Sequence, residues 1–198
     1  MNPFRTFSSK LIPIDAINID TDQIIPKQFL KLVQKTGYEK FLFYDWRFDK
    51  NGNPKKDFVL NNPNYRDRSI LLVRENFGSG SSREHAVWAL RDFGIRAVIA
   101  PSFADIFYNN CFKNGVLPTT INHDKIEYLF NHAETIEIKI DLAAQRIEFD
   151  SNRIHFEISE SNKKMLIEGI DEIGMTLKFE SYISNYEKTK ATYSLNVV

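Results

Sequence analysis

Residues 69–100 constrain the fold more than any other part of the sequence. They begin with the apolar run SILLV at 69–73, pass through the glycine- and serine-rich stretch NFGSGSS, and end with a second apolar run, RAVIA, at 96–100. Between these runs, residues 84–93 place apolar side chains at helical spacing and are followed by Gly94, which commonly ends a helix. Two buried strands joined through a helix pair in parallel. The segment therefore predicts an α/β fold.

The remaining sequence indicates further helices and strands. Polar and apolar residues alternate over 134–140, 145–150 and 153–158, which is typical of antiparallel strands with one exposed face. Other predicted strands cover 10–14 and 116–120. The predicted helices are a two-turn helix that starts at Pro26, a helix over 102–115 that Ser102 caps and Gly115 ends, a helix near 124–132, and helical structure over 163–186.

The chain length predicts a single domain. A chain of 198 residues can bury a full hydrophobic core but is short for two domains, and no internal repeat divides it. We expect the folded core to span residues 10–180 and a tail to follow over 187–198. Residues 36–67 are rich in Asn, Asp, Gly, Pro and aromatic side chains, so we expect a long irregular excursion there, of a kind that is commonly functional or mobile.

Charge and hydropathy exclude several classes of function. The 26 basic and 26 acidic residues cancel, so no excess of positive charge attracts nucleic acid or a membrane surface. The first residues lack the charged and then apolar profile of a signal peptide, and no stretch reaches the roughly 18 apolar residues of a membrane span. We therefore expect a cytoplasmic protein.

The single cysteine, Cys111, limits the metal chemistry of the chain. One cysteine forms no internal disulfide, and it cannot supply the three or four thiolates that hold an iron–sulfur cluster. Its place on an apolar helix face predicts a small buried hydrophobic residue. His123, His132 and His155 occur singly and without the spacing of metal ligands, so we expect no metal site in this chain.

The glycine- and serine-rich loop at 78–82 matches none of the common nucleotide or hydrolase motifs. A Walker phosphate loop needs a lysine, and no lysine lies within 73–112. A dinucleotide-binding loop needs a glycine where Arg83 stands, and a serine-hydrolase elbow around Ser82 needs a glycine where Glu84 stands. These three kinds of site are therefore excluded.

Two interpretations of this loop stay open on the residues alone. Ser81 with Glu84 three positions later fits a capping box, which stabilises a helix by about 1 kcal/mol and needs no function. Alternatively, backbone N–H groups at the start of the helix, with Arg83 beside them, bind a carboxylate and activate a serine oxygen. The capping box does not explain why glycines, serines and an arginine gather after a buried strand, where open α/β sheets place their ligands.

Four motifs occur in order along the chain: NIDTDQIIPKQFL, FLFYDWRF, RENFGSGSSREHAVWAL and IAPSFADIFYNNCFKNGVLP. The third resembles the signature of the swivel domain of the aconitase superfamily. The four together resemble the small subunits of bacterial 3-isopropylmalate dehydratases, over residues 10–177. This resemblance implies a swivelling three-layer β/β/α domain, here with a C-terminal helical extension.

The resemblance also implies an activity and a partner. Such enzymes are hydro-lyases that interconvert 2-isopropylmalate and 3-isopropylmalate in leucine biosynthesis by removing and re-adding water. In the family a [4Fe–4S] cluster belongs to a separate large subunit, which agrees with the single cysteine here. The resemblance therefore implies that this chain binds no cofactor itself and that the active site forms at the interface with the large subunit, around a small dicarboxylate.

By the resemblance, residues of the loop have separate roles. Ser81 occupies the position of the serine that acts as base on the substrate C–H bond. Ser82 and Arg83 match positions that bind a substrate carboxylate, and Gly80 lets the backbone approach the substrate.

Supporting roles are expected for three more residues. His85 either orients the site or is a structural histidine of the following helix. Thr21 and Asp22 resemble a TD motif that borders the active site in the family, and turn formation explains them equally well. The aromatic stretch 41–48 is interpreted as a partly mobile element near the substrate's isopropyl group or the partner surface, with core packing as the alternative.

Two other functions remain as alternatives. The first is the small subunit of a related hydratase that acts on citraconate, dimethylmaleate or homoaconitate, since pocket residues from both chains decide the substrate. The second is a carboxylate-binding or regulatory module without catalysis. The intact set of Ser81, Ser82 and Arg83 argues against the second, because binding alone does not require the base.

Overall fold

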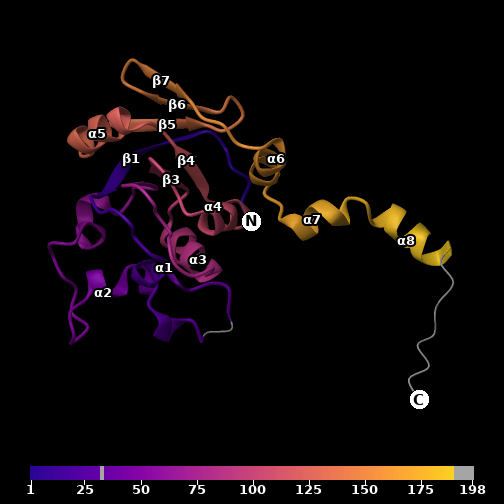
Figure 1. Cartoon of the computed structure of the whole chain (residues 1–198), viewed down its shortest axis with the longest axis horizontal. Coiled ribbons are helices and arrows are strands. Elements are labelled where there is room, and N and C mark those ends of the chain that lie inside the picture. The colour runs from indigo at the N-terminus through magenta and orange to yellow at the C-terminus, as the bar shows by residue number, and fades with distance from the viewer. Residues whose placement is uncertain (32–33, 190–198) are drawn as a thin grey trace.

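The computed structural model describes residues 1–31 and 34–189, and these form one continuous seven-stranded sheet in the order β4-β3-β2-β1-β5-β6-β7 (Figure 1). Strands β1 to β4 pair in parallel, and β5, β6 and β7 continue the sheet as antiparallel neighbours. The strands are β1 (Phe7–Ile14), β2 (Ile70–Val73), β3 (Ala97–Ala100), β4 (Leu117–Thr120), β5 (Glu137–Asp141), β6 (Arg146–Phe149) and β7 (Asn152–His155).

Helices connect the strands and continue past the last one. The α-helices are α1 (Thr21–Ile24), α2 (Tyr44–Arg47), α3 (Glu84–Phe93), α4 (Asp105–Lys113), α5 (His123–His132), α6 (Glu160–Glu168), α7 (Glu172–Leu177) and α8 (Glu180–Thr189). Single 3-10 turns are η1 (Lys27–Phe29), η2 (Glu39–Phe41), η3 (Val59–Asn61) and η4 (Pro63–Tyr65). Among the residues that the structure describes, no helix combines the length and the apolar character needed to cross a membrane.

The parallel strands form the middle of three layers, because alternate residues of a strand point to opposite faces of the sheet. Leu71 and Val73 of β2 belong to a buried cluster that includes side chains of α3 and α4. Ile70 and Leu72 belong to a second buried cluster, which includes α5 and the antiparallel strands on the other face (Figure 1). The predicted α/β class and the three-layer β/β/α arrangement are confirmed.

Strand β1 joins the two halves of the sheet. Its first residues pair with β5 and its last residues pair with β2, so that Ser9 lies opposite Ile138 and Leu11 lies opposite Ile70. The strand is therefore longer than the predicted 10–14, because the polar residues before that run pair with the antiparallel half.

The prediction of a two-turn helix after Pro26 is wrong. The described chain forms only the turn η1, and residues 32 and 33 of the predicted helix lie outside the described residues. Pro26 precedes the turn in an extended conformation, with ψ of 146°. Phe29 stacks on Phe41 with ring centroids 4.1 Å apart, so contacts between loops take the place of helical hydrogen bonds.

The prediction that Ser102 caps the helix after β3 is also wrong. Helix α4 begins at Asp105, and its N-cap residue Ala104 has no side-chain hydrogen bond to the helix. The Ser102 hydroxyl instead accepts a hydrogen bond from the backbone N–H of Asn76, with 2.9 Å between the two atoms. Ser102 therefore joins two loops that follow neighbouring strands.

The aromatic-rich segment 36–67 is largely irregular, as predicted, but part of it belongs to the core. It contains α2 and the turns η2, η3 and η4. Tyr38, Leu42 and Phe43 are fully buried in the same cluster as α3. Within the stretch 41–48, the core-packing alternative is therefore confirmed for Leu42 and Phe43.

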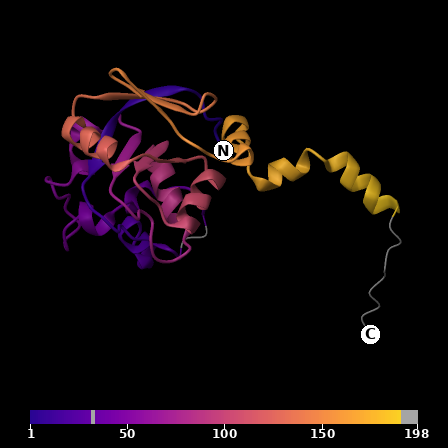
Figure 2. The same cartoon turned by 45° about the horizontal axis from the view of Figure 1, so that its top comes forward.

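The predicted C-terminal helical extension is confirmed. Helix α6 packs on the body through Met165 and Leu166, whereas α7 and α8 project away from the body in both views (Figure 1, Figure 2). The predicted tail over 187–198 begins too early, because α8 continues to Thr189. Residues 190–198 lie outside the described residues.

Candidate active site

The glycine- and serine-rich loop lies where the carboxyl ends of three parallel strands meet. Asp20, after β1, forms a parallel bridge with Ser79, and the backbone N–H of Gly78 donates to the carbonyl of Ile19 at 2.8 Å. On its other side the loop is bridged to the segment that precedes α4. The loop is thus held between its two neighbours at the edge where open α/β sheets bind ligands.

Two glycines give this loop its path. Gly78 and Gly80 have φ of +78° and +90°, in the left-handed region that L side chains rarely adopt. A Cβ atom on Gly78 would lie 2.1 Å from Cγ of Phe107, which leaves no room for a side chain. A Cβ atom on Gly80 would lie 3.5 Å from Cβ of Asp20, so there the backbone conformation is what favours glycine.

The start of α3 has no side-chain cap. The N-cap residue is Arg83, so Ser81 lies too far from the first turn to form the predicted capping box with Glu84, and Glu84 binds a side chain at the end of α4 instead. In the part of the chain that the structure describes, the backbone N–H groups of Ser82, Glu84 and His85 donate to no protein acceptor. Unsatisfied N–H groups and the positive end of the helix dipole together favour an anion.

Ser81 has a fixed backbone and an exposed side chain. Its carbonyl accepts hydrogen bonds from Oγ1 of Thr21 at 3.1 Å and from the backbone N–H of Arg83 at 2.8 Å. Thr21 is buried, and its own N–H donates to the carbonyl of Ser79 at 2.9 Å. The structure therefore brings Thr21, which was expected to border the site, into direct contact with the loop.

Arg83 and Asp22 form an ion pair beside Ser81. The Arg83 side chain is 15% exposed, and the Asp22 carboxylate also lies 3.3 Å from Nζ of Lys27. A guanidinium carries five N–H donors, so the pair leaves donors for a second carboxylate. Asp22 can therefore hold the arginine in place while the arginine binds an anionic ligand.

His85 packs into the aromatic core behind the loop. Its ring lies 4.5 Å from the ring of Trp88 and 5.6 Å from that of Tyr38, measured between centroids. Burial lowers the pKa of His85, Glu84 acts in the opposite direction, and Arg83 lowers it further. The imidazole is therefore neutral at pH 7, and its surroundings fit the structural alternative as well as a supporting role.

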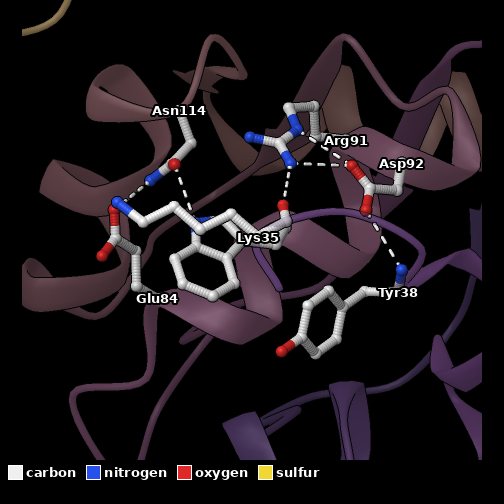
Figure 3. Close-up of polar contacts among 7 residues, drawn as sticks. Lys35, Tyr38, Glu84, Arg91, Asp92 and Asn114 are labelled. Carbon is white, nitrogen blue, oxygen red and sulfur yellow. Dashed lines mark hydrogen bonds and ion pairs between the residues drawn. The ribbon is translucent and has the colours of Figure 1, made fainter. Parts of the chain in front are cut away.

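Asn114, at the end of α4, was not singled out by the sequence. Its amide oxygen accepts a hydrogen bond from Nε1 of Trp88 at 2.8 Å, and its amide nitrogen donates to Oε1 of Glu84 at 2.8 Å (Figure 3). The one signal in the sequence is a polar residue directly before Gly115, and this pattern is also what an ordinary helix end contains. The contact with α3 depends on tertiary structure and leaves no local pattern.

The described residues contain no cluster of three or more His, Cys, Asp or Glu side chains that would hold a metal ion. Cys111 is fully buried, and burial raises the pKa of its thiol well above the ordinary value. An iron–sulfur cluster needs several accessible thiolates, so the residues of this chain do not fit such a cluster.

Comparison with known proteins gives consistent matches. Residues 1–124 match the family described as the aconitase C-terminal domain. The chain is 49% identical over 191 residues to the 3-isopropylmalate dehydratase small subunit of Brevibacillus brevis, a match that covers 94% of this chain and 98% of that protein. It is 48% identical over 196 residues to the corresponding subunit of Bacillus subtilis, with 98% of each chain covered.

A solved structure is similar to the whole fold. It is the crystal structure of a 3-isopropylmalate dehydratase from Methanocaldococcus jannaschii, with a TM-score of 0.66 and 26% sequence identity. The similarity covers 91% of this chain and 99% of that one.

Proposed function

Because the chain belongs to the aconitase C-terminal domain family and, within it, to the small subunits of 3-isopropylmalate dehydratase, we propose that its loop 78–83 forms one half of a shared active site. As such a small subunit, the chain is part of a hydro-lyase of leucine biosynthesis. The other half of the site is contributed by the large subunit. The substrate is 2-isopropylmalate or 3-isopropylmalate, each a small dicarboxylate.

The single observation that carries this proposal is the arrangement around the uncapped start of α3. An exposed serine, Ser81, lies two residues before Arg83, and the free N–H groups of the first helical turn are beside both. A structural loop gains nothing from leaving these donors unsatisfied, since a capping side chain stabilises a helix by about 1 kcal/mol. A bound carboxylate satisfies them.

Arg83 and the helix start hold one carboxylate of the substrate. The guanidinium meets a carboxylate with two parallel hydrogen bonds, which fix its orientation, and the N–H of Ser82 adds a third donor. Asp22 keeps the guanidinium in place through the ion pair on its other side. Gly80, in its left-handed conformation, keeps side-chain atoms away from the bound group.

Ser81 moves the proton on the carbon next to that carboxylate. As base it takes this proton while a carbon–carbon double bond forms and the hydroxyl on the adjacent carbon leaves, and in the reverse direction it returns the proton. An alkoxide whose pKa lies roughly six units above the working pH costs about 8 kcal/mol to form. The helix dipole offsets roughly 1 kcal/mol of this, and Arg83 and the N–H donors offset more once the partner seals the site from water.

The iron–sulfur cluster of this enzyme class belongs, in our proposal, to the large subunit. This chain has one cysteine, and that cysteine is buried in the core. The departure of the hydroxyl group is therefore the task of the large-subunit half of the site, whereas binding of a carboxylate and transfer of the carbon-bound proton are the tasks of this chain.

Reconstitution from the two purified chains tests the proposal. This chain is mixed anaerobically with a 3-isopropylmalate dehydratase large subunit, and the reaction is monitored by the absorbance of the unsaturated intermediate. We expect the mixture to convert 2-isopropylmalate. Each chain alone is expected to give no turnover. Full activity of the large subunit alone, or an inactive mixture in which size-exclusion chromatography shows a complex and the large subunit's cluster is intact, would contradict a shared site.

A further inference from the structure

The Asn114 side chain forms hydrogen bonds with two residues of α3 that lie one turn apart, next to the proposed site. Its amide contacts Glu84, the first residue of the helix, and Trp88, one turn further along the same face (Figure 3). The amide nitrogen also donates to the carbonyl of Asn110 at 2.9 Å. Asn114 is 7% exposed, so these three bonds satisfy both amide hydrogens and the oxygen of a buried group.

The orientation of the amide follows from chemistry. The indole Nε1–H of Trp88 can only donate, so it must face the amide oxygen of Asn114. The amide nitrogen therefore faces Glu84, whose carboxylate can only accept when it is ionised. The uncharged amide of Asn114 thus donates to the carboxylate of Glu84, the residue directly after Arg83.

The first turn of α3 needs such a contact because it has no local cap. Arg83 provides no capping side chain, and the N–H groups that a cap would satisfy stay free for the ligand. On its other side, Trp88 packs against His85, so the same asparagine supports two consecutive residues of the first turn. A displacement of about 1 Å of such donors can cost about 100-fold in rate.

We propose that Asn114 is a positioning residue for catalysis, which fixes the first turn of α3 through Glu84 and Trp88 so that the loop and its free N–H groups are aimed at the substrate. This inference rests on the proposed function. Asn114 itself touches no substrate, and it acts only through the two residues that it binds.

Charged and titratable groups lie on two sides of Asn114. At the start of α3 they are Arg83, Glu84 and His85. Lys35, Arg91, Asp92 and Arg96 line the same pocket as Asn114, and Nζ of Lys35 lies 5.8 Å from the centroid of the Trp88 ring. Lys113 precedes Asn114 on α4, but it forms an ion pair with Glu172 at 3.1 Å. A new carboxylate at position 114 therefore has Glu84 as its direct hydrogen-bond neighbour.

The substitution Asn114→Asp tests the proposal through pH. At low pH the two carboxyl groups share one proton, so the aspartic acid still donates to Glu84 and still accepts from Trp88. At higher pH both groups ionise at hydrogen-bond distance and repel each other, because a like charge so close raises the pKa of the pair. We expect kcat/KM of the reconstituted enzyme to fall about tenfold more between pH 6 and pH 9 than it does in the control.

The matched control is Asn109→Asp, which makes the same chemical change on the exposed side of α4. Among the described residues, the Asn109 side chain donates only to the carbonyl of Asp105 within its own helix. The rescue variant is Glu84→Gln combined with Asn114→Asp, in which the glutamine amide donates to the new carboxylate and the polarity of the pair is reversed. We expect its pH profile to return to that of the control.

Three outcomes separate the possible failures. If the wild-type mixture does not turn over 2-isopropylmalate, the proposed function is wrong, and the inference that rests on it is wrong as well. If the wild type is active and the folded Asn114→Asp variant, checked by circular dichroism, has the same pH profile as Asn109→Asp, Asn114 is structural only and the inference is wrong. If Asn114→Asp does not fold, the double variant decides: a profile that still falls with pH overturns the inference, and a profile like that of the control supports it.

Discussion

Replacement of Gly78 by alanine probes the geometry that holds the loop in place. Two effects are expected to lower the free energy of unfolding. Alanine is strained at the φ of +78° that this residue has, and its new Cβ would lie 2.1 Å from Cγ and 2.5 Å from Cβ of Phe107. Phe107 is 2% exposed and belongs to the core cluster under α3, so its ring has little space to move. The loop or the ring must therefore shift.

The two effects can be separated with a second glycine. Gly52 has a similar φ of +80°, but among the described residues no heavy atom beyond its two chain neighbours lies within 4 Å of the point that a Cβ would occupy there. The left-handed conformation alone costs about 1–2 kcal/mol. Overpacking of a core adds about 1–3 kcal/mol, so we expect Gly78→Ala to lower the free energy of unfolding by about 2–5 kcal/mol and Gly52→Ala by about 1–2 kcal/mol.

Urea denaturation followed by circular dichroism measures this difference. With a slope of about 2 kcal/mol per molar urea, the midpoint of Gly78→Ala is expected to fall by about 1–2.5 M and that of Gly52→Ala by about 0.5–1 M. Equal midpoints for the two variants would refute the reasoning, because they would show that the contact with Phe107 does not restrict the loop.

Two further predictions concern neighbouring side chains. Arg83→Lys keeps the charge but loses the planar pair of donors, which weakens carboxylate binding by about 1.5–3 kcal/mol. We expect kcat/KM of the reconstituted enzyme to fall about 10- to 150-fold. A loss under about threefold would argue against carboxylate binding by Arg83. Burial lowers the pKa of His85 in the folded state, so the unfolded chain binds the proton more readily. Protonation of this histidine therefore lowers the free energy of unfolding as the pH falls below about 6.5. The urea midpoint should therefore drop less between pH 7.5 and pH 5.5 in His85→Gln than in the wild type, and equal drops would show that His85 does not titrate abnormally.

Local signals in the sequence predicted the part of the fold around the loop. The strand β2, the helix α3 and its end at Gly94 follow from apolar periodicity and from a glycine with φ of 101°, which are properties of neighbouring residues. The position of Ser81 and Arg83 at the carboxyl end of a parallel strand follows from the same unit.

Contacts between distant segments were not predictable in this way. The sequence suggests a capping box between Ser81 and Glu84, but none forms there, because the N-cap of α3 is Arg83, two residues further along than that pattern requires. A capping box forms instead at the start of α1, between Asp20 and Gln23. Glu84 is then free to bind Asn114, a residue 30 positions away. No local pattern encodes such a pair.

The aromatic segment 36–67 illustrates the same limit. Its composition predicts irregular backbone, but burial of Tyr38 and Phe43 depends on where α3 comes to lie. The backbone N–H of Tyr38 donates to Asp92 at 3.1 Å, across 54 positions of sequence. Proximity of the stretch 41–48 to the isopropyl group of the substrate stays a prediction.

Turnover by Ser81→Ala in the complex with the large subunit tests the central claim most directly. The control is Ser151→Ala, which makes the same chemical change at an exposed residue between β6 and β7, outside the proposed site. With assembly confirmed by size-exclusion chromatography, we expect the rate of 2-isopropylmalate dehydration to fall about 10²- to 10⁴-fold in Ser81→Ala and to change by less than about threefold in the control. Near-normal turnover by an assembled Ser81→Ala complex would contradict the assignment of this hydroxyl as the group that moves the proton.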